Sequence, residues 1–196
     1  MPTHDDPERD DAENNEKHSL VTSGLFKSRT VLVFGEVNHK LARTVTGQLL
    51  ALAHQSDEPI RVFVNSQGGH VESGDTIHDM IRFIKPKVQI VGTGWVASAG
   101  ALIYVAANKE NRFCLPNTRF LLHQPMGGAR GQASDIEIET HQILQMRERL
   151  NRIFSRETNQ PYDQVVQKTE RNFWMTAAEA VEFGLVSRIV ERVGEL

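Results

Sequence analysis

Short runs of branched apolar residues recur along the first half of the chain, and longer segments with helical periodicity separate them. The apolar runs have the length of buried strands and are 31–34, 61–65 and 88–92. The intervening segments repeat apolar residues as one face of a helix does, and are 41–54 and 73–84. Strands that alternate with helices form βαβ units with parallel strands. The first half therefore predicts an α/β fold with a mostly parallel sheet, whose first strand, 31–34, is buried on both faces.

The second half contains shorter strands and one long helix. Two strand-like pieces, 112–115 and 119–122, lie on either side of a Pro-Asn turn, and a long helix is expected from Ser134 onward. Its apolar positions recur at near-helical spacing over about five turns, longer than one small domain usually needs. These positions are Ile136, Ile143, Met146, Leu150 and Ile153. Part of this stripe is therefore expected to face another subunit.

The remaining elements are expected to close the domain. Pro161 ends the long helix, and a short helix follows it. Thr176 resembles a helix N-cap, with Glu179 completing a capping box. The apolar segment 185–190 is expected to be the last strand.

Charge and composition exclude several classes of protein. The chain has 22 Lys and Arg against 25 Asp and Glu, a formal net charge of −3, so it is no polybasic nucleic-acid binder. Its longest small and apolar run, 99–107, is far shorter than the roughly 20 residues of a membrane-spanning helix. The single cysteine, Cys114, makes no internal disulfide and is expected in the core. We expect a cytoplasmic protein that binds neither nucleic acid nor membrane.

The N-terminal segment differs in character from everything that follows it. Residues 1–18 hold seven Asp and Glu and no aromatic or β-branched apolar residue, which leaves nothing to bury. The segment also lacks the apolar stretch of a signal peptide. We expect a disordered acidic tail at 1–18 and a single domain at 19–196.

Ser98 lies between an apolar strand and an apolar helical run, in the segment 94–100, Gly-Trp-Val-Ala-Ser-Ala-Gly. A serine on a tight strand-to-helix turn exposes its hydroxyl at the positive end of the helix, where backbone N–H groups stabilise an oxyanion. A simple serine N-cap fits equally well, since the pattern is not the stricter Gly-x-Ser-x-Gly. The segment therefore leaves a nucleophile and a cap as alternatives.

Two further features are expected at the same edge of the sheet. Gly68 and Gly69 follow the second strand, where a tight turn presents backbone amides as candidate oxyanion donors, or is an ordinary glycine turn. His123 follows the strand 119–122. Within hydrogen-bond reach of Ser98 it would serve as general base and then general acid, although a lone strand-end histidine is more often a surface or core residue. No histidine spacing matches a metal motif such as HExxH, so no metal site is expected.

The segment 127–132, Gly-Gly-Ala-Arg-Gly-Gln, is rich in flexible backbone and poor in side chains. Such a segment can add an extended strand to a peptide through main-chain hydrogen bonds. A mobile loop is the alternative interpretation.

Six motifs, in one order and at one spacing over residues 25–192, resemble the proteolytic subunit of the Clp protease, the ClpP family. They are 65–69 (Asn-Ser-Gln-Gly-Gly), 94–100, 112–117 (Arg-Phe-Cys-Leu-Pro-Asn), 123–125 (His-Gln-Pro), 131–137 and 178–186. The resemblance implies the ClpP/crotonase-like spiral of ββα units, with a protruding handle of strand plus long helix at 125–158.

The resemblance also implies an assembly and partners. It implies two stacked heptameric rings that cut unfolded polypeptides to short peptides inside a chamber. An AAA+ unfoldase such as ClpX or ClpA feeds that chamber and uses the ATP, so this chain is expected to need no cofactor.

Roles for individual residues follow from the same resemblance. Ser98 matches the nucleophile and His123 the general base, while the backbone N–H groups of Gly69 and Ala99 match the oxyanion hole. The substrate-pairing strand of the handle is matched by Gly127, Gly128, Ala129, Arg130, Gly131 and Gln132.

Two contact regions are implied in the same way. Glu170 and Arg171 match an acid–arginine pair at the ring-to-ring contact. The apolar pocket that docks the unfoldase is matched by Phe63, Phe83, Phe113 and Val190. Arg61 stands where an aromatic residue is usual in that pocket.

Asn172 occupies the position of the family's catalytic aspartate. Its amide oxygen can still orient His123, but it supplies no negative charge to stabilise the imidazolium. In a serine protease the Asp-to-Asn exchange lowers turnover by roughly 10⁴. Weak or conditional activity is therefore expected.

Three hypotheses follow for the function. The first is a Clp-type serine peptidase. The second, motivated by Asn172, is a structural or regulatory subunit with low activity that mixes with an active ClpP paralogue in one ring. The third is a crotonase-type acyl-CoA enzyme, which shares the fold and the paired-amide oxyanion hole but does not explain Ser98 together with His123.

Overall fold

A seven-stranded sheet organises the described chain, residues 19–196 of the computed structural model. The strands β1 (Thr30–Val37), β2 (Ile60–Gly69), β3 (Val88–Ala97), β4 (Arg112–Cys114) and β7 (Arg188–Ile189) follow one another across it, all parallel. β5 (Arg119–Leu122) pairs parallel with the end of β3, and β6 (Phe173–Thr176) pairs antiparallel with β5. The α/β fold with a mostly parallel sheet is confirmed, while the predicted tail at 1–18 lies outside the described residues.

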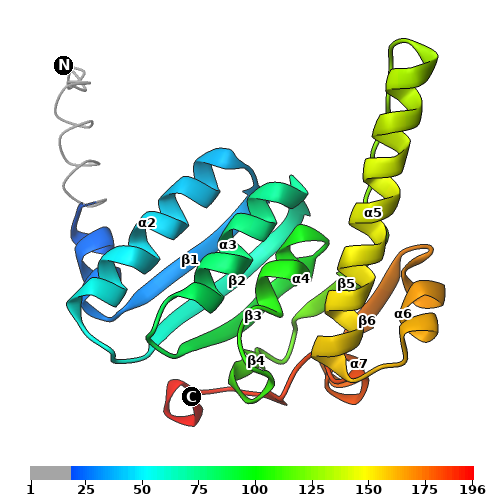
Figure 1. Cartoon of the computed structure of the whole chain (residues 1–196). Coiled ribbons are helices and arrows are strands. Elements are labelled where there is room, and N and C mark those ends of the chain that lie inside the picture. The colour runs from blue at the N-terminus through cyan, green and yellow to red at the C-terminus, as the bar shows by residue number, and fades with distance from the viewer. Residues whose placement is uncertain (1–18) are drawn as a thin grey trace, which may run out of the picture.

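Three helices cover one face of the sheet (Figure 1). They are α2 (His39–Gln55), α3 (Val71–Phe83) and α4 (Ala99–Tyr104), and residues 19–27 form a further helix before β1. The main hydrophobic core lies between these helices and the strands and includes Val33, Leu49 and Val62, all fully buried. The short 3₁₀ turns η1 (Lys109–Asn111) and η2 (Val193–Glu195) complete this part. No helix within residues 19–196 has the length and apolar character to cross a membrane.

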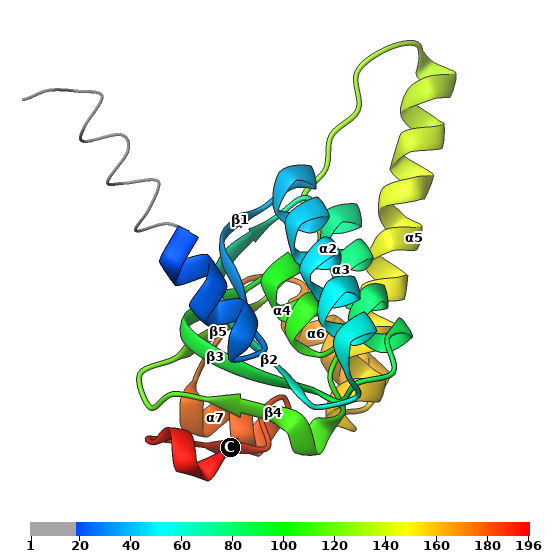
Figure 2. The same cartoon turned by 90° about the vertical axis from the view of Figure 1, so that its left-hand side faces the viewer.

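A long helix protrudes from the rest of the molecule. The chain leaves β5, rises through an irregular segment and returns as α5 (Ala133–Thr158), beside that segment (Figure 2). The helix begins one residue before the predicted start at Ser134. At its base Leu150 is buried, whereas Ile136 near its tip is 40% exposed. α6 (Tyr162–Thr169) and α7 (Ala177–Phe183) follow, with the predicted capping box of Thr176 and Glu179 at the start of α7.

The prediction that the first strand is buried on both faces is wrong for the single chain. Val31 and Val33 are buried, but Leu32 and Phe34 between them are 36% and 46% exposed. Helices cover only one face of this part of the sheet, so alternate residues of β1 face away from the core. An unbroken apolar run shows that both faces of a strand are apolar. It does not show which element covers the second face.

The predicted last strand, 185–190, is also too long, because only Arg188 and Ile189 form β7. Leu185 and Val186 are buried, but their backbone N–H groups donate to Ala180 O at 2.9 and 3.1 Å and so close the end of α7. Their amides are therefore unavailable for a sheet ladder. The four-residue strand β6 was not predicted, since Phe173–Thr176 is too short to show a period in the sequence.

Candidate active site

Ser98 occupies the sharp turn between β3 and α4. Its backbone angles, φ 54° and ψ −122°, lie outside the helical and extended regions, and a non-glycine residue at positive φ stores about 1–3 kcal/mol of strain. Ser98 stands at the N-cap position of α4, yet its side chain makes no capping hydrogen bond. The simple N-cap interpretation is therefore wrong, and the predicted tight strand-to-helix turn is confirmed.

The backbone of the 68–69 turn packs directly against Ser98. A Cβ atom on Gly68 would lie 2.6 Å from Ser98 Cβ and 2.9 Å from Ala97 O, so only glycine fits. Gly68 N–H donates to Ser66 Oγ at 3.1 Å, so it already has a hydrogen-bond acceptor within the turn. Gly69, at φ 146°, lies so close to β1 that a Cβ would meet Val37 O at 2.3 Å. The turn is therefore held rigidly beside the serine.

Ala99 is the first residue of α4, and the N–H groups of a helix's first turn have no carbonyl partner within the helix. Ser98 O accepts from the N–H groups of Ala101 and Leu102 at 2.9 and 3.1 Å, which fixes this end of the helix. Ala99 N–H thus lies next to the Ser98 side chain at the positive end of α4. The arrangement is compatible with the oxyanion role expected for Ala99.

His123 and Ser98 line one small, mainly apolar pocket. The other lining residues are Val71, Ala99, Leu102, Leu122, Pro125, Leu150 and Phe154. The two residues meet because β5 lies beside the end of β3, where Ser98 N–H donates to Leu121 O at 2.9 Å. Within residues 19–196 no direct hydrogen bond joins Ser98 Oγ to the His123 ring. Catalytic contacts of this kind are often long before substrate binds.

Burial controls the protonation of the pocket's histidine. Desolvation lowers the pKa of His123 below its ordinary value, and a hydrogen bond with the Gln124 backbone opposes this only in part. The imidazole is therefore neutral at pH 7 and able to accept a proton. Cys114 behaves differently, because burial raises the pKa of its thiol to about 12, in agreement with its predicted place in the core.

The antiparallel pairing of β5 and β6 brings Asn172 toward His123. Leu122 pairs with Phe173, so His123 and Asn172 each lie one residue beyond the last pair. Asn172 is exposed, and within the described chain its side chain makes no hydrogen bond to the His123 ring. Asn172 thus lies in register with His123, and its expected role in orienting the imidazole stays a prediction.

The glycine-rich segment 127–132 has no strand partner within the described chain. It runs beside α5, and Gly127 lies so close to that helix that a Cβ would meet Ile143 Cδ1 at 2.6 Å. Gly131 has φ 146°, a conformation that favours glycine. The segment therefore leaves its backbone unpaired with any strand within the described chain, as pairing with a substrate strand would require.

The two predicted contact regions are only partly assembled in one chain. Phe113 and Val190 pack with Phe63 in a small apolar cluster separate from the main core. Phe83, the fourth predicted docking residue, lies outside this cluster at the end of α3 and is 78% exposed. Glu170 pairs within the chain with Arg147 of α5, while its neighbour Arg171 is exposed.

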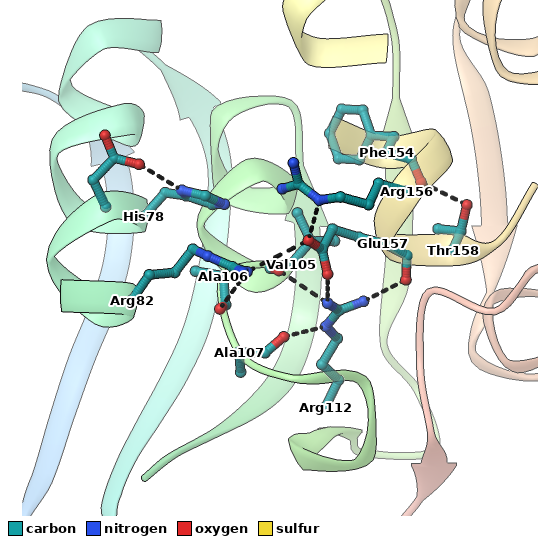
Figure 3. Close-up of polar contacts among 11 residues, drawn as sticks. His78, Arg82, Val105, Ala106, Ala107, Arg112, Phe154, Arg156, Glu157 and Thr158 are labelled. Atoms are coloured by element: carbon teal, nitrogen blue, oxygen red, sulfur yellow. Dashed lines mark hydrogen bonds and ion pairs between the residues drawn. The ribbon is translucent and has the colours of Figure 1, made fainter. Parts of the chain in front are cut away.

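A buried ion pair, not predicted from the sequence, anchors the base of α5 near the pocket (Figure 3). The fully buried guanidinium of Arg112 donates to Glu157 Oε2 and, at 2.8 Å, to Glu157 O. The Glu157 carboxylate also pairs with Arg82 and Arg156. Phe154, one turn earlier, lines the pocket of Ser98. The only sequence signal was an arginine within an apolar strand.

Comparison with known proteins gives a consistent result. The family model described as Clp protease matches residues 13–193. The chain is 59% identical over 194 residues to the ATP-dependent Clp protease proteolytic subunit 3 of Rhizobium meliloti, covering 96% of this chain and 100% of that protein. It is 55% identical to subunit 2 of Pseudomonas aeruginosa, covering 92% of each chain.

Solved structures agree in fold. ClpP1 from Listeria monocytogenes superposes with a TM-score of 0.81 at 53% identity, covering 90% of this chain and 99% of that one. An Asn-to-Asp mutant of the same ClpP1 superposes with a TM-score of 0.84 at 54% identity, covering 89% and 98%.

Proposed function

Because the chain belongs to the Clp protease family, we propose that it is a proteolytic subunit of an ATP-dependent Clp protease and cleaves peptide bonds with Ser98 as its nucleophile. The observation that carries the proposal is the strained turn at Ser98, which shares a pocket with a histidine whose pKa is lowered. A strained turn that exposes a serine hydroxyl beside a neutral imidazole is the arrangement that nucleophilic catalysis needs.

The reaction proceeds through an acyl-enzyme. Ser98 Oγ attacks the peptide carbonyl carbon while His123 accepts the hydroxyl proton, and the backbone N–H groups of Gly69 and Ala99 hold the developing oxyanion. His123 then gives its proton to the leaving amine as the C–N bond breaks. Water, activated by His123, attacks the ester and releases the acid product and free Ser98.

Asn172 limits this chemistry. Its amide oxygen orients the His123 ring once the two side chains meet, but it adds no negative charge when the imidazolium forms. We therefore expect slow turnover, or turnover that depends on assembly. The extended backbone of 127–132 pairs with the substrate chain through main-chain hydrogen bonds.

The assembly belongs to the same proposal. Two heptameric rings enclose the sites in a chamber in the cytoplasm, with Glu170 and Arg171 at the ring-to-ring contact. An AAA+ unfoldase docks on the cluster of Phe63, Phe113 and Val190, with the exposed Phe83 as the fourth docking residue. The unfoldase alone uses ATP, so this chain requires no cofactor.

A second candidate function rests on one observation. Asn172 is exposed and makes no hydrogen bond to His123 in the described chain, as expected for a regulatory subunit with low activity that works beside an active paralogue.

Hydrolysis of a fluorogenic peptide by the assembled protein separates the two functions. The first predicts measurable cleavage that Ser98→Ala abolishes. Cleavage that Ser98→Ala leaves unchanged contradicts the nucleophile. Absence of cleavage in an intact multi-ring sample supports the regulatory subunit.

A further inference from the structure

His70 connects the glycine turn beside Ser98 to helix α3. It directly follows Gly69 in the chain and is the N-cap residue of α3. Its backbone N–H donates to Val37 O at 2.8 Å, and its ring nitrogen Nδ1 accepts from Ser73 N–H at 3.2 Å. One residue therefore ties β1, the turn and the start of α3 together.

Histidine is an uncommon residue for such a cap. Helix N-caps are usually Ser, Thr, Asp or Asn, and this chain uses Asn38 at α2, where Oδ1 accepts from Leu41 N–H at 2.9 Å. A histidine can accept a backbone N–H only through a ring nitrogen that carries no proton. His70 therefore has its proton on Nε2, which lies 3.3 Å from Glu72 Oε2. The contacts thus assign one tautomer to this ring.

The buried hydroxyl of Ser73 extends the network to a second helix. Ser73 is 1% exposed, and its Oγ lies 3.0 Å from His70 Nδ1 and 3.3 Å from Nδ1 of His39, the first residue of α2. Since His70 Nδ1 has no proton, the hydroxyl donates to it and accepts from His39 Nδ1–H. The two imidazole rings also lie against each other, with centroids 4.5 Å apart. The cap is therefore supported from α2 as well as from its own helix.

The first turn of α3 lies against both expected oxyanion donors. Gly69 directly precedes the cap, and Val71, the first residue of α3, lines the candidate active-site pocket. A Cβ on Gly74 would lie 3.2 Å from Ala99 Cβ, and Gly74 N–H donates to His70 O at 3.1 Å. α3 lies between α2 and α4 in the fold (Figure 1). A shift of this turn would therefore change the separation of the Gly69 and Ala99 amides.

We propose that His70 is a positioning residue of the peptidase. Its unprotonated Nδ1 caps α3 and thereby holds the Gly69 amide where it and the Ala99 amide can bind one oxyanion. The inference rests on the proposed peptidase function and adds a residue to it. His70 acts through the turn that it fixes and touches none of the reacting atoms. Loss of a whole oxyanion donor lowers kcat by about 10²–10³, so a displaced donor should cost about tenfold.

Two substitutions separate the cap from the ring. His70→Phe keeps a ring against His39 and removes the acceptor, whereas His70→Asn removes the ring and keeps an acceptor, as Asn38 does in α2. With a fluorogenic peptide and the assembled protein, we expect His70→Phe to lower kcat by about tenfold and to change KM by less than about twofold. His70→Asn should keep kcat within about threefold of the wild type. Equal kcat values in the two variants, or a greater loss in His70→Asn, overturn the proposal.

Thr176→Ala is the matched control for loss of a helix cap. Thr176 caps α7 at the end of β6 away from Asn172, and its Oγ1 accepts from Glu179 N–H at 3.3 Å. The variant should lower the melting temperature, as His70→Phe does, and leave kcat unchanged. If it lowers kcat as much as His70→Phe, the loss reports weaker folding and the positioning role is rejected.

Hydrogen exchange of the segment 68–75 tests the cap without hydrolysis. In the full-length protein His70→Phe should speed exchange there, whereas Thr176→Ala should not. Unchanged exchange in His70→Phe overturns the inference even if Ser98 proves inactive. Conversely, cleavage that depends on Ser98, with the same kcat in the wild type and His70→Phe, supports the peptidase and rejects the positioning role.

Discussion

Replacement of Glu157 by glutamine tests the anchor at the base of α5. The substitution keeps the size of the side chain and removes its charge. The Arg112 side chain is fully buried and that of Glu157 is 12% exposed, so the guanidinium would lose its counter-charge where little solvent can replace it. Loss of one partner of a buried pair costs about 3–5 kcal/mol.

The remaining contacts place the expected loss near the lower end of that range. Arg112 keeps its hydrogen bonds to Ala107 O at 2.7 Å, Glu157 O at 2.8 Å and Val105 O at 3.0 Å (Figure 3). We therefore expect Glu157→Gln to lower the free energy of unfolding by about 3 kcal/mol. Chemical denaturation at fixed protein concentration measures this loss.

Two controls identify the cause. Arg156→Gln removes an arginine whose side chain is 60% exposed, and should cost less than about 1 kcal/mol. The double variant Arg112→Met with Glu157→Gln should lose less than the two single losses together, because no buried charge is left unpaired. A loss below about 1 kcal/mol for Glu157→Gln alone would refute the reasoning.

The anchor also has a pH dependence of known sign. Burial alone would raise the pKa of Glu157, but the hydrogen bond from Arg156 and the charge of Arg112 outweigh it, so the pKa is lowered. A lowered pKa means that the folded state binds this proton more weakly than the unfolded state. The stabilisation is therefore present above the ordinary pKa of a glutamate and disappears as pH falls through the lowered value. Glu157→Gln should remove this part of the acid sensitivity.

The remaining predictions concern the active site. Asn172→Asp should raise turnover at pH 7 to 8, because the carboxylate stabilises the imidazolium. An unchanged or lower rate in a steady-state assay would show that the missing charge does not limit turnover. As pH decreases, kcat/KM for peptide should fall when His123 becomes protonated, with a midpoint below 6.5 because its pKa is lowered. A midpoint above 7 would contradict neutral His123 as the general base. Gly68→Ala should abolish hydrolysis and lower the melting temperature, because the new Cβ would lie 2.6 Å from Ser98 Cβ. An active variant of normal stability would contradict the close packing of the 68–69 turn against Ser98.

The sequence predicted those features that local patterns determine. Small residues between an apolar strand and an apolar helix predict the turn at Ser98. The capping box at Thr176 is predictable because both of its residues lie within four positions. The sequence could not exclude a simple serine cap, because that depends on a capping hydrogen bond that only the structure shows to be missing.

Features that depend on distant segments could not be predicted in this way. Arg112 and Glu157 are 45 residues apart, and neither shows its partner in the sequence. Ser73 and His39 are 34 residues apart and meet only because α3 packs against α2. The place of Asn172 in the site came from resemblance alone, and the structure adds its register beside His123.

The proposed peptidase activity requires that Ser98 and His123 form an activated pair despite Asn172. Labelling of the assembled protein with a fluorophosphonate probe, read by intact mass, tests it most directly. We expect one adduct per subunit, absent from Ser98→Ala and formed more slowly as pH falls through the lowered pKa of His123. A folded multi-ring sample that gains no adduct, or an adduct that persists in Ser98→Ala, would contradict it.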